Sequence, residues 1–182
     1  MQPNGLYVFL EGPDDERFFN AVIRPLLAAE IDFFKIIMYS TKTSSVIQSI
    51  LKTVKAQTNL KYLFFCDHDT QGDSSLCITK RKEKICEKYG QQPELTRIFV
   101  VREEVESWYL AGITAVNKQK FKLPTFTTTD HITKEDFLAM MPKQFTSSND
   151  FMIEVLKEYS LQYAVSEATN TSLRYFCEKC LQ

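Results

Sequence analysis

The chain has 182 residues, of which 44% are apolar, and its formal net charge is −1. This length fits one domain, or one domain with an elaboration. The apolar content is enough to bury a sizeable core, which argues against intrinsic disorder. The balanced charge excludes a global basic field that would attract nucleic acid. Any contact with nucleic acid must therefore come from a local basic patch or be bridged by a metal ion.

The cysteines and the start of the chain bear on the cellular compartment. The chain has five cysteines, an odd number, and no signal peptide precedes them. Free thiols in a reducing cytoplasm are the expected consequence. No uninterrupted apolar run approaches the ~20 residues that a membrane-spanning helix needs. We therefore expect a cytoplasmic protein that has no membrane segment.

Four short apolar runs, rich in residues that favour β structure, predict buried strands. They cover residues 6–10, 33–38, 62–66 and 96–101. Helical patterns lie between them, and this alternation implies crossover units and a mostly parallel sheet. In such sheets, sites gather at the carboxyl ends of the strands.

The predicted helices define the organisation of the chain. The first covers about 14–27, and Pro25 inside it predicts a kink. A loop over 118–133 separates a core of about 1–112 from a helical extension of about 133–182. The sequence thus predicts one domain of the α/β class, a small parallel sheet flanked by helices with a helical C-terminal extension. The remaining predicted helices are 43–57, 74–89, one that begins near Glu104, 134–141, 151–159 and 172–181.

The strongest motif directly follows the third predicted strand, and it reads Asp67-His68-Asp69-Thr70-Gln71-Gly72. Two carboxylates that lie two residues apart on an extended strand end can point the same way, and Mg²⁺ prefers such oxygen ligands. Gly72 permits a turn that a side chain would obstruct. A solvated acidic turn uses the same residue types. The position after so apolar a strand favours the metal site.

A second acidic motif, Leu10-Glu11-Gly12-Pro13, ends the first predicted strand. A glutamate at this position is well placed to work beside a metal ion, either as a ligand or by moving protons to or from a reacting oxygen. The alternative is a surface glutamate. Asp14 and Asp15, which follow, are better interpreted as charges that favour a helix N-terminus.

These two motifs, in this order, resemble the Toprim family, which occurs in topoisomerases, bacterial primases, recombination proteins and OLD-type nucleases. The shared pattern is a hydrophobic strand that ends in Glu-Gly, here Glu11-Gly12, and a later strand that ends in Asp-x-Asp, here Asp67 and Asp69. The resemblance covers roughly the first 105 residues. It implies a four-stranded parallel sheet, Mg²⁺ (with Mn²⁺ as a substitute) held by the two aspartates, and Glu11 as general acid or base in phosphodiester chemistry.

A third segment, residues 102–111, resembles part of the small stand-alone Toprim-like proteins, some of which are linked to phage defence. This resemblance implies that Glu106 faces the metal site, with Glu103 or Glu104 as a second candidate. On a helix, Glu103 and Glu106 would share one face. The alternative is a charged helix start with Trp108 in the core.

One basic cluster is a candidate contact for nucleic acid. Lys80, Arg81, Lys82 and Lys84 lie on the helix predicted after the Asp-x-Asp motif, near enough to meet a phosphate backbone. The alternative is a solvated helix face. The Cys177-x-x-Cys180 motif lacks the further ligands of a zinc site, so we expect these residues in a helix core.

Three functions remain open from the sequence. The first is an Mg²⁺-dependent nuclease or other phosphodiester-cleaving enzyme, linked to phage defence. The second is a non-catalytic regulatory or nucleic-acid-binding subunit that works with an ATPase partner. No Walker motif is present, so that ATPase would be a separate protein. The third is phosphotransfer of the haloacid-dehalogenase type, but there the Asp-x-Asp motif follows the first strand rather than the third.

Overall fold

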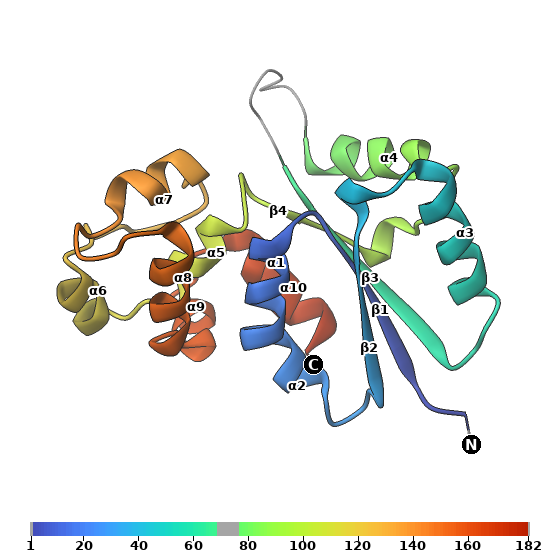
Figure 1. Cartoon of the computed structure of the whole chain (residues 1–182), viewed down its shortest axis with the longest axis horizontal. Coiled ribbons are helices and arrows are strands. Elements are labelled where there is room, and N and C mark those ends of the chain that lie inside the picture. Colours follow the sequence, from blue (N-terminus) through green and yellow to red (C-terminus); the bar gives the residue numbers. More distant parts are fainter. Residues whose placement is uncertain (1, 69–76, 182) are drawn as a thin grey trace. The chain divides into compact units, whose positions relative to one another are not determined.

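The computed structural model describes residues 2–68 and 77–181 (Figure 1). The chain divides into two compact units, an N-terminal unit of Met1–Val100 and a C-terminal unit of Val101–Gln182. That the chain folds as a single domain, with a core that extends to about residue 112, stays a prediction. No helix in the described part of the chain is long and apolar enough to cross a membrane.

A four-stranded parallel sheet forms the centre of the N-terminal unit, with the strand order β2-β1-β3-β4. The central strand β1 pairs in parallel with β2 on one side and with β3 on the other. All four predicted strands are confirmed, although the last begins two residues late because residues 95–97 form a 3-10 turn. The strands are β1 (Gly5–Leu10), β2 (Phe33–Met38), β3 (Leu60–Asp67) and β4 (Ile98–Val101).

Helices cover both faces of this sheet (Figure 1). On one face, α3 (Ser44–Lys55) and α4 (Ile78–Lys88) pack over Phe9 and Phe64. On the other face, Phe19 contacts Phe65 edge to face, with ring centroids 6.4 Å apart. Because side chains alternate along a strand, a sheet covered on both faces needs continuous apolar runs. This explains why the strands could be predicted from such runs.

The first helical segment is divided into three pieces near Pro25. The chain forms α1 (Pro13–Phe18), a five-residue π-helical turn (Phe19–Ile23) and α2 (Arg24–Leu27). Proline has no N–H and its ring clashes with the carbonyl group four residues earlier. The π turn before Pro25, and a helix that restarts with Pro25 in its first turn, place the proline where its missing N–H is tolerated. The kink predicted at Pro25 stays a prediction.

The C-terminal unit is helical, and an aromatic core holds it together. Phe151 packs against Phe137 and Phe121, with ring centroids 5.0 Å and 6.0 Å away. The three predicted helices of the extension are confirmed, but the loop predicted from residue 118 begins only at Lys122, where α6 ends in a left-handed conformation. The helices are α5 (Glu106–Ala111), α6 (Ala115–Phe121), α7 (Lys134–Met140), α8 (Ser148–Lys157), α9 (Leu161–Ser166) and α10 (Thr171–Cys180).

Candidate functional site

Glu11 is the first residue after β1, and the turn that follows β2 holds it in place. The register pairs Leu10 with Met38, so Glu11 lies level with Tyr39. The Tyr39 hydroxyl donates a hydrogen bond to Glu11 Oε2 at 2.8 Å. The hydroxyl of Ser40 donates to the backbone carbonyl of Glu11. Both the side chain and the backbone of the predicted catalytic residue are therefore fixed.

Asp67 is the last residue of β3, and it lies at the same edge of the sheet as Glu11. The register pairs Phe9 with Phe64, and its continuation places Glu11 level with Cys66, one residue from Asp67. Arg81 on α4 reaches this edge, where its Nε donates to the Asp67 carbonyl oxygen at 2.8 Å. Parallel pairing thus brings two of the predicted site residues to neighbouring strand ends, with a guanidinium beside one of them.

The carboxylates of Glu11 and Asp67 both affect the pKa of the same two buried side chains, Tyr39 and Cys66. Burial raises the pKa of Tyr39 well above its usual value, and the negative charges of Glu11 and Asp67 raise it further. Burial also raises the pKa of Cys66 to about 12; Arg81 opposes this shift, whereas Asp67 and Glu11 add to it. Because both carboxylates act on the same two buried groups, negative charge is concentrated at this edge of the sheet.

The donor atoms at this edge suit a hard cation. Mg²⁺ takes oxygen ligands and usually keeps several waters, so it needs only one or two carboxylates from a protein. Asp67 and Glu11 supply such oxygens. Asp69, the other predicted ligand of this motif, lies outside the described residues. Within the described ranges, no group of three or more His, Cys, Asp or Glu side chains is arranged to hold a metal ion.

Glu106 lies in the C-terminal unit, where it begins α5 with a side chain that is only 3% exposed. Its Oε1 lies 3.4 Å from Lys134 Nζ. The prediction that Glu103 and Glu106 share a helix face is wrong. Glu103 precedes α5 and has a φ of 53°, a left-handed conformation that no regular helix contains. A role for Glu106 as a metal ligand stays a prediction.

A buried hydrogen-bond network that sequence reasoning missed joins the start of α5 to the start of α10. The Asn170 amide donates to the hydroxyls of Ser107 and Thr129. Ser172 accepts from Trp108 Nε1 at 2.8 Å and donates to Asn170 Oδ1 at 2.8 Å. The sequence signal was limited to an asparagine before a helical pattern, which is a common N-cap.

The basic cluster on α4 divides into two pairs. Arg81 and Lys82 are half-buried, and Lys82 Nζ donates to the Leu95 carbonyl at 3.2 Å. Burial lowers the pKa of Lys82. Lys80 and Lys84 are exposed and share one face of the helix by their spacing of four residues. Binding of nucleic acid by the cluster stays a prediction, and the exposed basic surface is smaller than the sequence suggested.

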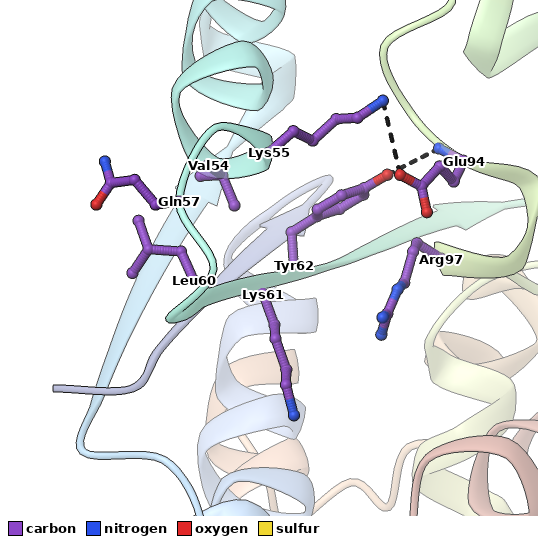
Figure 2. A pocket seen from close by; sticks show the side chains of 8 residues that line it. All are labelled: Val54, Lys55, Gln57, Leu60, Lys61, Tyr62, Glu94 and Arg97. Carbon is purple, nitrogen blue, oxygen red and sulfur yellow. Dashed lines mark hydrogen bonds and ion pairs between the residues drawn. The ribbon is translucent and has the colours of Figure 1, made fainter. Parts of the chain in front are cut away.

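A small hollow of about 190 Å³ lies at the opposite end of β3, beside its first residues (Figure 2). Figure 2 shows Lys55 and the Tyr62 hydroxyl converging on Glu94. Lys55 Nζ lies 3.6 Å from Glu94 Oε1, and the Tyr62 hydroxyl accepts from the Glu94 N–H at 2.8 Å. The positive charge of Lys55 offsets the negative charge of Glu94. The hollow therefore differs, in position and in charge, from the acidic edge, which is the edge of the sheet that carries Glu11 and Asp67.

The fold and the site define an α/β protein whose small parallel sheet, flanked by helices, carries acidic residues at the carboxyl ends of adjacent strands. No family model and no curated protein matches the sequence. Among solved structures, the chain is similar to the C-terminal region of the Burkholderia pseudomallei OLD protein. The identity is 16% and the TM-score is 0.43, over 100% of this chain and 96% of that chain.

Proposed function

We propose that this protein is an Mg²⁺-dependent phosphodiester-cleaving protein of the Toprim type, with nucleic acid as its substrate and Mn²⁺ as a substitute metal. The observation that carries the proposal is the position of Glu11 and Asp67. They end adjacent parallel strands, and their charges act together on buried Tyr39 and Cys66. Sites of α/β sheets form at such strand ends.

Each residue at the acidic edge has a chemical role in this proposal. Asp67 would hold the cation together with Asp69, the second aspartate of the sequence motif. When bound, Mg²⁺ would stabilise negative charge on the phosphate. Glu11 takes a proton from the attacking oxygen or gives one to the leaving oxygen. Arg81, anchored on the Asp67 carbonyl, offers a guanidinium that suits a phosphate oxygen.

Cleavage of labelled single- and double-stranded DNA and RNA, with Mg²⁺, Mn²⁺ or EDTA, tests the proposal. We expect cleavage that depends on the metal and is abolished by Asp67→Ala. The matched control is Glu87→Ala, which removes an exposed carboxylate from α4 of the same unit and should leave cleavage unchanged. Cleavage that persists in EDTA or in Asp67→Ala would contradict the proposal.

A second candidate is a non-catalytic subunit that works with a separate ATPase partner in phage defence. The observation in its favour is that two of the four basic side chains of the cluster make hydrogen bonds within the protein. Arg81 and Lys82 donate to the backbone carbonyls of Asp67 and Leu95. Of the four residues of the cluster, Lys80 and Lys84 then remain as exposed phosphate contacts. Co-purification with an ATPase, without cleavage by the isolated chain in either metal, would favour this function.

A further inference from the structure

The turn that follows β2, Tyr39–Thr41, does more than connect two elements. We infer that Tyr39 is a positioning residue for Glu11, whose carboxylate it holds in the orientation needed for proton transfer. This inference rests on the proposed function, because it assigns a role within that same site. Three features of the site support it: the rigidity of Tyr39, the fixation of Glu11, and the chemistry of the hydrogen bond between them.

Tyr39 is a rigid donor. Its side chain is only 4% exposed. Its ring stacks on Phe64, with centroids 4.8 Å apart and planes 25° from parallel, and meets Tyr89 edge to face at 6.3 Å. A ring enclosed in this way cannot change rotamer without disturbing the core. The hydroxyl therefore stays aimed at Glu11 Oε2.

Glu11 is held at several points around this hydrogen bond. The Ser40 hydroxyl binds its carbonyl oxygen. The next N–H, that of Gly12, donates to the Asp15 carboxylate at 3.0 Å. With the backbone fixed on both sides, the Glu11 side chain retains only its own torsions, and the bond from Tyr39 restricts those. A single hydroxyl can therefore decide where the carboxylate points.

The chemistry of the bond fits a positioning role. The phenol of Tyr39 donates its hydrogen bond to a single carboxylate oxygen, Oε2 of Glu11. Burial and the charge of Glu11 raise the pKa of Tyr39, so the phenol keeps its own proton. The proton that moves during cleavage is exchanged between Glu11 and the reacting oxygen, and Tyr39 neither gains nor loses one. Hydrogen-bond partners that orient the side chains of a metal site typically contribute about 10- to 100-fold in activity.

Tyr39→Phe, with Tyr89→Phe as its matched control, tests the inference. Tyr89 belongs to the same aromatic cluster and is 1% exposed, but within the described residues no hydrogen bond joins it to Glu11. Kinetics with Mg²⁺ on the nucleic acid that the wild type cleaves best should show kcat reduced about 10- to 100-fold in Tyr39→Phe. KM should stay within about twofold, since the lost contact orients a reacting group rather than substrate. Tyr89→Phe should match the wild type.

A second variant, Ser40→Ala, removes the hydroxyl that fixes the Glu11 backbone. Ser40 is exposed, so this change leaves the core intact even if Tyr39→Phe proves unstable. A fall in kcat in Ser40→Ala at unchanged KM supports the inference. Unchanged kcat in a folded Tyr39→Phe variant would overturn it, as would a Tyr39→Phe variant that changes only KM or an equal loss in Tyr89→Phe. If Tyr39→Phe does not fold, unchanged kcat in Ser40→Ala would overturn it. A wild type that cleaves no phosphodiester with either metal would reject the proposed function itself.

Discussion

At the acidic edge, the two carboxylates of Glu11 and Asp67 lie beside side chains that are buried from water. Glu11 and Asp67 are half-buried, but the groups beside them, Tyr39 and Cys66, are 4% and 1% exposed. Charges act more strongly where water is excluded, because the effective dielectric constant is lower there. The two carboxylates therefore influence these neighbours in a way that two acids on an open surface would not.

Burial of Cys177 on α10 predicts a specific dependence of stability on pH. Burial raises the pKa of this thiol from 9.0 to about 11, and Cys180 adds to the shift. Below pH 9 the thiol is protonated in the folded and unfolded states, so its contribution to stability is complete. Between pH 9 and 11 only the unfolded chain releases the proton, so the free energy of unfolding falls, by up to about 1.4 kcal/mol per pH unit.

Urea unfolding of Cys177→Ala between pH 8 and 11 should therefore show a shallower fall than the wild type. The control is Cys77→Ala, which removes an exposed thiol and should leave the slope unchanged. The same slope in Cys177→Ala and the wild type would contradict the assignment.

Helices and strands with a regular apolar pattern could be predicted from the sequence. Irregular backbone, very short helices and contacts between distant residues could not. The strand before Asp67 could be predicted because a sheet covered on both faces needs a continuous apolar run. The left-handed Glu103 could not, since glutamate carries no signal for positive φ. The six-residue helix α9 is too short to show a helical period. The Tyr39 to Glu11 bond joins residues 28 positions apart, and only the strand register brings them together.

Asn170, which begins α10 and joins it to α5, should be unusually sensitive to substitution. Its Oδ1 accepts from the Leu173 N–H, and its amide donates to two buried hydroxyls. Asn170→Ala removes a helix cap and leaves buried hydroxyls with fewer partners, so we expect a loss of about 2–4 kcal/mol. Thr133→Ala, at the exposed cap of α7, should cost about 1 kcal/mol. Equal losses in urea unfolding would contradict a structural role for the network.

The formal net charge of the whole molecule is −1, but its charged side chains are unevenly distributed. The N-terminal unit gathers carboxylates at the carboxyl ends of its strands, and α4 adds Arg81 beside Asp67. Clustered carboxylates repel one another, and a bound divalent cation relieves that repulsion. A cation that binds the folded state and not the unfolded chain stabilises the fold, so the proposed site predicts a higher stability in the presence of metal.

A divalent-metal site at the edge that carries Glu11 and Asp67 should be detectable by thermal unfolding in Mg²⁺ and Mn²⁺. At ten times its dissociation constant, a metal adds RT ln 11, about 1.4 kcal/mol, which for a chain of this size raises the melting temperature by about 3–6 °C. We predict this rise for the wild type, its loss in Asp67→Asn, and its retention in Glu87→Gln, with EDTA as the metal-free reference. A wild type whose melting temperature ignores both cations, or an Asp67→Asn variant that responds as the wild type does, would contradict the account.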